Sequence, residues 1–219
     1  MKKGSGKTAS TSRALHVRSG KAAASPSVNA VFLVGFMGAG KSSVGRALGQ
    51  HLNWMFEDLD DRIVARERRT VAEIFRNSGE SEFRRAERAA LQQILEELRG
   101  GVAKIIALGG GAFVQEENAA LLQASGVPAV FLDAPVEELW QRCSAQARET
   151  GAQRPLLQSQ EQFRKLYAAR RRSYSRAGVE VPTGGRPVEA IAAEIARTLR
   201  LKRIASRSET VRIEEGEAE

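Results

Sequence analysis

Short, mainly apolar runs alternate along the chain with longer segments in which apolar residues recur every three or four positions. The runs have the length of buried strands and occupy residues 30–34, 54–58, 102–108, 129–132 and 179–181. The longer segments have helical spacing and occupy residues 43–48, 61–69, 83–98, 135–146 and 187–201. Strands that alternate with helices predict an α/β fold with a parallel sheet, helices on both faces and right-handed crossovers.

Local signals mark where one of these helices begins and ends. Thr70 to Glu73 has the form of a capping box and predicts a helix that starts there. Asn77-Ser78-Gly79 predicts its end, because glycine is the usual residue just after a helix. The segment from Phe83 to Leu98 is then expected to form a separate helix.

The best-defined motif directly follows the first predicted strand. Residues 35–42 read GFMGAGKS and match the phosphate-binding loop G-x-x-x-x-G-K-[ST], or P-loop. Such a loop presents backbone N–H groups and a helix N-terminus to phosphates, and its last hydroxyl binds Mg²⁺. We therefore predict a P-loop NTPase-type fold, with Ser42 as a metal ligand and a nucleotide site formed by Gly35, Gly38, Ala39, Gly40, Lys41, Ser42 and Ser43. The alternative is a glycine-rich turn that binds nothing.

Two other polar segments follow predicted strands. Asp58 and Asp60 come at the end of the second strand, and Gly109-Gly110-Gly111 follows the third. Ligands of open parallel sheets bind outside the carboxyl ends of the strands, so these segments and the P-loop are expected to converge there. The alternatives are helix N-caps for the two aspartates and a simple tight turn for the glycines.

Three arginines, Arg84, Arg154 and Arg170, lie beyond the predicted strands. The planar guanidinium group binds carboxylates and phosphates with two hydrogen bonds, as a kinase with an anionic acceptor requires. The chain has no N-K-x-D string for reading guanine, and the domain is small for an ABC-type or AAA-type ATPase. The alternatives are a solvated-face charge for Arg84 and a register shifted by one within Arg170–Arg172.

The chain resembles the shikimate kinase family from about Asn29 to Leu201. The motifs that carry the resemblance are GFMGAGKS, Asp58 to Asp60, Glu82-Phe83-Arg84 with Glu87, the triple glycine with Ala112, Arg154-Pro155-Leu156-Leu157, and Arg170 four residues before Tyr174. The resemblance implies transfer of the γ-phosphate of ATP to the 3-hydroxyl of shikimate. This reaction is a step towards chorismate and the aromatic amino acids.

The resemblance also implies roles for individual residues. Asp60 would hold the substrate hydroxyls and accept the proton, and Lys41 and Arg154 would complete the catalytic set. Arg154 would reach the nucleotide phosphates from a closing lid. The implied shikimate-binding residues are Asp60, Arg84, Gly109, Gly110, Gly111 and Arg170. Asp58 would support Mg²⁺ together with Ser42.

We therefore expect the chain to consist of a disordered basic tail (1–28), a kinase domain (29–205) and an acidic tail (206–219). Within the domain we expect a helical substrate-binding region at about 59–99 and a lid at about 145–160. Two features depart from the family pattern. The chain between Arg142 and Arg154 is several residues longer than in bacterial shikimate kinases, and the segment after Val181 lacks the usual acid after Thr183.

The charge of the chain is concentrated at its ends. The net charge is +8, yet the first 28 residues hold six basic and no acidic side chains, and residues 206–219 carry −3. The remaining +5 suits a site for polyphosphate and an anionic substrate. Only 5% of the residues are aromatic, which is too few for a surface on which nucleic-acid bases could stack. No nucleic-acid partner is therefore expected.

The expected partners are therefore the small molecules ATP and shikimate, and the family implies a monomer. No apolar stretch approaches the roughly 20 residues of a membrane span. The single Cys143 suits a reducing compartment, and we expect the cytoplasm. The alternative is a plastid or other organelle, if the basic first 28 residues are a transit peptide. The alternative functions are another small-molecule P-loop kinase, such as a gluconate-type enzyme, and a non-catalytic nucleotide-binding module.

Overall fold

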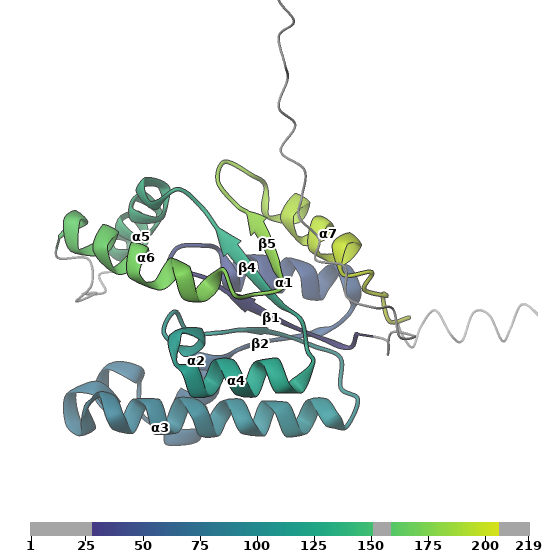
Figure 1. Cartoon of the computed structure of the whole chain (residues 1–219), viewed down its shortest axis with the longest axis horizontal. Coiled ribbons are helices and arrows are strands. Elements are labelled where there is room, and N and C mark those ends of the chain that lie inside the picture. Colours follow the sequence, from purple (N-terminus) through teal and green to yellow (C-terminus); the bar gives the residue numbers. More distant parts are fainter. Residues whose placement is uncertain (1–27, 151–158, 206–219) are drawn as a thin grey trace, which may run out of the picture.

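The computed structural model describes residues 28–150 and 159–205, which form one α/β unit (Figure 1). The strands are β1 (Ala30–Val34), β2 (Met55–Asp58), β3 (Lys104–Ala107), β4 (Ala129–Asp133) and β5 (Val179–Pro182). The helices are α1 (Lys41–Leu52), α2 (Leu59–Glu67), α3 (Val71–Arg99), α4 (Glu116–Ser125), α5 (Val136–Thr150), α6 (Gln160–Tyr174) and α7 (Val188–Thr198), with a 3₁₀ turn η1 (Ala112–Val114). The predicted tails lie outside these residues except at Val28.

The strands form one parallel sheet in the order β2-β3-β1-β4-β5, which confirms the predicted fold class. In register, Phe32 of β1 lies opposite Ile106 of β3 on one side and Ala129 of β4 on the other. Helices α1 and α7 lie side by side, and α3 lies with α4 away from them (Figure 1). Because all strands run in one direction, their carboxyl ends share one edge of the sheet.

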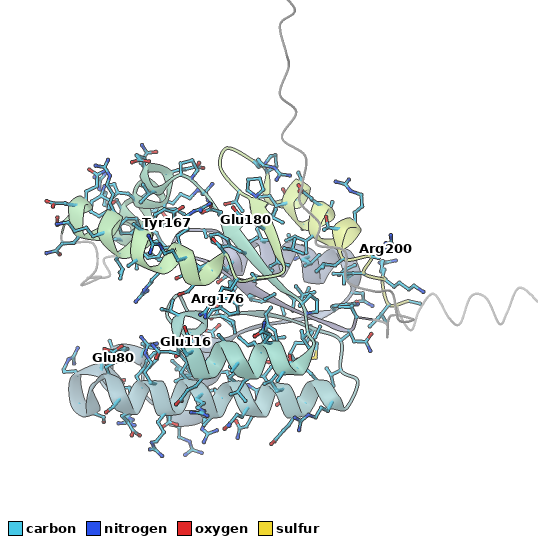
Figure 2. All side chains as sticks on the ribbon, in the orientation of Figure 1. Glu80, Glu116, Tyr167, Arg176, Glu180 and Arg200 are labelled. Carbon is cyan, nitrogen blue, oxygen red and sulfur yellow. The ribbon has the colours of Figure 1, made fainter. Side chains whose placement is uncertain are left out.

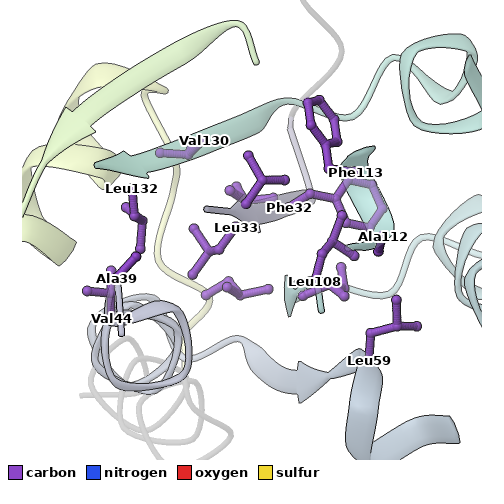
Figure 3. Packing of buried hydrophobic residues seen from close by; sticks show 14 of the residues in the cluster. Phe32, Leu33, Ala39, Val44, Leu59, Leu108, Ala112, Phe113, Val130 and Leu132 are labelled. Atoms are coloured by element: carbon purple, nitrogen blue, oxygen red, sulfur yellow. The ribbon is translucent and has the colours of Figure 1, made fainter. Parts of the chain in front are cut away.

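The core surrounds β1, whose five residues are all buried. Figure 3 shows Phe32 and Leu33 of this strand among Val44 of α1, Val130 of β4 and Phe113 of η1. Strands buried on both faces read as continuous apolar runs, which is why the sequence located them well. This packing holds the loops that leave β1, β3 and β4 at fixed positions.

Charged side chains join helices α2 and α3 to the sheet. The buried Lys104 of β3 donates to Glu57 of β2 at 2.7 Å and to Glu97 of α3 at 2.6 Å. Arg62 of α2 donates to both carboxylate oxygens of Glu97, at 2.8 and 2.9 Å. These hydrogen bonds lower the pKa of Glu97 to about 2. Four elements are thereby tied together close to Asp58, the next residue after Glu57.

Several helix boundaries differ from the prediction. The predicted end at Gly79 is confirmed: α3 consists of two helical segments that meet at a kink there, where Gly79 has the non-helical angles φ 80° and ψ 177°. The second segment resumes directly after Gly79, ahead of the predicted start at Phe83, and continues to Arg99. Glu80 then pairs with Arg84 four residues on, which supports the resumed first turn. Helices α4 and α6 were not predicted. No helix within residues 28–150 and 159–205 is both long and apolar enough to cross a bilayer.

Replacing Thr70 by Ala tests the capping box that begins α3. The Thr70 hydroxyl accepts from the Glu73 N–H at 3.2 Å, and the Glu73 carboxylate accepts from the Thr70 N–H at 2.7 Å. We expect Thr70→Ala to lower the free energy of unfolding by about 0.5–2 kcal/mol, as measured by urea denaturation. Ser81→Ala, which removes an exposed hydroxyl from the same helix, is the control. Equal effects of the two substitutions would contradict the capping role.

Candidate functional site

The P-loop joins the end of β1 to the start of α1. Its glycine at position 38 has φ 78°, in the left-handed region, and a Cβ there would lie 2.8 Å from the Sγ atom of Cys143. Gly40, the residue before α1, provides no side-chain cap. The N-terminus of α1 therefore presents its backbone N–H groups and positive dipole end to the cavity beside it.

Lys41 extends across this loop. Its ammonium group donates to the carbonyl oxygens of Gly35 and Phe36, both at 3.0 Å. Burial lowers the pKa of Lys41, and the negative charges of Asp60 and Asp58 oppose that shift. The predicted phosphate-binding lysine and the two aspartates thus lie within electrostatic reach of one another.

Asp58 serves two elements at once. One carboxylate oxygen accepts from the backbone N–H of Asp60 at 3.1 Å, so Asp58 is the N-cap of α2 and that alternative is confirmed for it. The other oxygen accepts from the hydroxyl of Ser42 in the P-loop at 2.8 Å. This cap also explains why α2 begins at Leu59, two residues before the predicted start.

The Ser42–Asp58 contact brings together two oxygen donors that could hold a metal ion. A hydroxyl and a carboxylate are the oxygen donors that Mg²⁺ accepts, and this ion usually takes its other ligands from phosphates and water. Among the described residues no group of three or more His, Cys, Asp and Glu side chains is placed to hold a metal.

The triple glycine brings bare backbone against two predicted site residues. A Cβ on Gly109 would lie 2.7 Å from the Oδ1 atom of Asp60. A Cβ on Gly111 would lie 2.8 Å from both terminal nitrogens of Arg84. Because the backbone at Gly111 has φ −103°, which any residue adopts, the requirement there is for space. The turn is more than a tight connection, since a carboxylate and a guanidinium group are packed directly on it.

Arg84 is held in place by two carboxylates of its own helix. Its guanidinium group donates to Glu80 at 3.0 Å and to Glu87 at 3.0 Å. The Arg84 side chain is 21% exposed and the Glu87 side chain 1%, so the solvated-face alternative for Arg84 is wrong. Burial raises the pKa of Glu87, and the positive charge of Arg84 opposes that shift.

Only one of the three consecutive arginines of α6, Arg170–Arg172, faces the triple glycine. Arg170 donates to the carbonyl oxygen of Gly110 at 3.4 Å, and the hydroxyl of Tyr174 donates to the same oxygen. Arg171 instead donates to Asp133 at 2.7 Å, and Arg172 is exposed. Of the three arginines it is therefore Arg170, the predicted one, that contacts the triple glycine.

A cavity of about 590 Å³ lies between these groups. Its walls include the P-loop from residue 37 to residue 42, Ser43, Asp58, Asp60, Gly109 and Gly110. Gly111, Arg84 and Arg170 do not line it, but Arg170 contacts the carbonyl oxygen of Gly110 and Arg84 packs beside Gly111. The three segments that the sequence placed at the carboxyl ends of strands therefore do converge.

Three further residues line the cavity that the sequence prediction did not name as site residues. They are Arg142 of α5, Thr183 and Arg186. Arg142 donates to the carbonyl oxygens of Gly38 at 3.2 Å and Thr183 at 3.0 Å, and also to Glu138. The Glu138–Arg142 spacing of four residues on a predicted helix was the available signal.

The departure after Thr183 has a structural explanation. Where the family usually has an acid, this chain has Gly184, and a Cβ there would lie 2.9 Å from the Oε2 atom of Glu138. Glu138 also accepts from the N–H of Gly185 at 3.1 Å. The Glu138 carboxylate of α5 thus packs against the loop at Gly184 and Gly185.

Arg154 lies outside the described residues, so its place in the site stays a prediction. Of the predicted lid, residues 145–150 belong to the end of α5 and residue 160 begins α6. The lid itself is likewise a prediction.

Fold and site together define a class. A parallel sheet with a P-loop after its first strand, an aspartate pair after its second and a polar cavity at their carboxyl ends is a P-loop nucleotide-binding protein. Arg84, whose side chain is 21% exposed, lies beside the glycine turn that forms part of the cavity wall.

Comparisons with known proteins give the family. The family model for shikimate kinase matches residues 37–200. A shikimate kinase from Geobacter metallireducens is 41% identical over 172 residues, covering 77% of this chain and 90% of that protein. One from Persephonella marina is 32% identical over 171 residues, covering 78% and 98%. The structure of shikimate kinase from Acinetobacter baumannii in complex with shikimate is 32% identical, with a TM-score of 0.69, covering 78% and 92%.

This chain belongs to the shikimate kinase family, which confirms the resemblance.

Replacing Lys41 by Met tests the phosphate side of the cavity. We expect the substitution to weaken ATP binding at least about tenfold, because a charge-assisted contact to phosphate is lost. Isothermal titration calorimetry measures the dissociation constant directly. Lys165→Met, at an exposed lysine of α6, is the matched control and should bind ATP normally. Normal ATP affinity of the Lys41 variant would contradict the assignment.

Proposed function

We propose that this protein transfers the γ-phosphoryl group of ATP to the 3-hydroxyl of shikimate. One observation supports the proposal beyond family membership: Asp60, Arg84 and Arg170 all approach the glycine turn Gly109–Gly111. Asp60 and the first two glycines of this turn line the cavity that also contains the P-loop. A carboxylate for the hydroxyl and two guanidinium groups for an acid are what a hydroxylated carboxylic acid requires beside ATP.

Asp60 aligns the reacting hydroxyl. Burial raises the pKa of Asp60, as does the charge of Asp58, whereas Lys41 and Arg84 oppose the shift. The hydroxyl oxygen attacks the γ-phosphorus, the bond from that phosphorus to the β–γ bridging oxygen breaks, and the hydroxyl proton passes to the Asp60 carboxylate. Because the transition state is loose, positioning of the hydroxyl contributes more than removal of its proton.

Charge neutralisation comes from the P-loop side. Lys41 stabilises negative charge that develops on the phosphate oxygens, and the N-terminus of α1 contributes its dipole. Arg154 joins these groups in the proposal as a second cation for the phosphates.

Ser42 and Asp58 would hold Mg²⁺ in this proposal. The hydrogen bond that joins them supports the assignment, because it places two oxygen donors together in the cavity wall. When bound, the ion neutralises phosphate charge.

Arg84 and Arg170 bind the carboxylate of the acceptor. Glu80 and Glu87 fix the Arg84 guanidinium group, which reduces the conformational entropy lost on binding. Two separate arginines favour shikimate over a gluconate-type acceptor. The proposal also includes a monomeric protein in the cytoplasm, a reducing compartment that suits the buried thiol of Cys143.

A coupled assay of ADP release tests the proposal, with ATP and Mg²⁺ in the presence and absence of shikimate. We expect turnover that depends on shikimate, and a rise of at least about tenfold in the shikimate KM for Arg84→Ala, because a bidentate charged contact is lost. Arg85→Ala is the matched control, since Arg85 is an exposed neighbour that pairs with Glu82. Turnover with gluconate but not with shikimate would refute the proposal.

The pH dependence tests Asp60. The reaction needs the ionised carboxylate, so a pKa above the ordinary 3.8 moves the acid limb of kcat/KM to a higher pH than an ordinary aspartate gives. The nearby charge of Asp61 also raises the pKa of Asp60. Asp61→Asn should therefore shift the limb to lower pH while the pKa of shikimate itself stays fixed. A limb that does not move, or that moves upward, would argue against Asp60 as the titrating group.

A further inference from the structure

Helix α6 carries three consecutive arginines, and one of them contacts the triple glycine. Successive residues of an α-helix point about 100° apart, so the rotation of α6 about its axis sets which arginine faces the site. The neighbours of α6 should therefore include a group that fixes this rotation.

Asp133, the last residue of β4, binds α6 through both carboxylate oxygens. Its Oδ2 atom accepts from Nε and Nη2 of Arg171, at 3.1 and 2.7 Å. Its Oδ1 atom accepts from the hydroxyl of Tyr167 at 2.8 Å. Tyr167 and Arg171 are one helical turn apart, so the carboxylate holds one stripe of the helix at two points. Figure 2 shows Tyr167 on α6 and, on β5, Glu180, which also accepts from Arg171 at 3.1 Å.

The backbone of Asp133 is itself held from the nucleotide side of the cavity. Its carbonyl oxygen accepts from the N–H of Thr183 at 2.6 Å and lies 3.1 Å from the Thr183 hydroxyl. That hydroxyl is also 3.3 Å from the carbonyl oxygen of Ala39 in the P-loop. The Asp133 side chain is 15% exposed and that of Arg171 is 44% exposed, so the ion pair is partly open to solvent on the Arg171 side.

The P-loop also packs directly on α6. The ring of Phe36 meets Phe163 edge-on at 5.0 Å between centroids and Tyr167 edge-on at 5.6 Å. These contacts fix how close α6 lies, but aromatic packing alone tolerates some rotation. The polar contacts of Asp133 add the rotational constraint.

We infer that Asp133 is a positioning residue for shikimate: it holds and neutralises Arg171, which keeps Arg170 turned toward the triple glycine. Asp133 does not contact the substrates in this account, and it acts through α6. The inference rests on the proposed function, since it concerns the same acid-binding side.

Steady-state kinetics of Asp133→Asn test the inference. The substitution preserves the shape of the side chain and removes its charge. We expect the KM for shikimate to rise about fivefold to tenfold, because a charged group of the site is displaced, with kcat and the KM for ATP within about twofold of wild type. Arg172→Gln, which removes an exposed charge next to Arg171, is the control and should leave all three constants unchanged.

A double-mutant cycle separates positioning from general stability. If Asp133 acts through Arg171, the variant that combines Asp133→Asn with Arg171→Gln should have a shikimate KM no higher than that of Asp133→Asn alone. Tyr167→Phe, which retains the ring packed on Phe36, should raise the shikimate KM by a smaller factor. It provides a second test if Asp133→Asn folds poorly.

Each outcome bears on a distinct claim. An active wild type with an unchanged shikimate KM in Asp133→Asn would overturn the inference alone. The inference would also be overturned if the rises in shikimate KM of the two single variants multiplied in the double variant. Equal rises in the KM values for shikimate and for ATP, together with a lower Tm, would likewise show that Asp133 has only a structural role. A wild type without shikimate-dependent turnover would instead refute the proposed function, and this inference with it.

Discussion

The site depends on the close approach of charged side chains to the bare backbone of Gly109–Gly111. Asp60 from α2 and Arg84 from α3 both occupy positions where a Cβ on this turn would collide with them. Arg170 from α6 contacts the same turn through the carbonyl oxygen of Gly110. Helices that are far apart in the chain can therefore place a carboxylate and two guanidinium groups around one short segment. That segment stays fixed because it follows the buried strand β3.

Two aspartates at the carboxyl ends of strands, Asp58 of β2 and Asp133 of β4, each contact two other parts of the structure. Asp58 caps α2 with one oxygen and accepts from the P-loop hydroxyl of Ser42 with the other. Asp133 contacts Thr183 through its backbone and holds α6 through its side chain. Each aspartate thus links the sheet edge to a helix that carries a site residue.

The sequence predicted what local chemistry specifies. The P-loop, the capping box at Thr70 and the strands with continuous apolar residues all lie where expected, because each signal is contained in a few neighbouring residues. Helix α4 was missed because four of its five apolar residues, at 119–122, are consecutive and do not follow a helical stripe. Helix α6 was missed because arginines dominate its last turn. Arg142 was missed because its partners, Gly38 and Thr183, are distant in the chain.

The affinity of Gly111→Ala for shikimate is the most direct test of this account. The backbone at Gly111 accepts alanine without strain, so the added methyl group tests space beside Arg84 alone. Calorimetry should show shikimate binding weakened at least about tenfold, because the guanidinium group is displaced, and ATP binding within about twofold of wild type. Unchanged shikimate affinity would contradict the claim that this bare backbone assembles the acid-binding side.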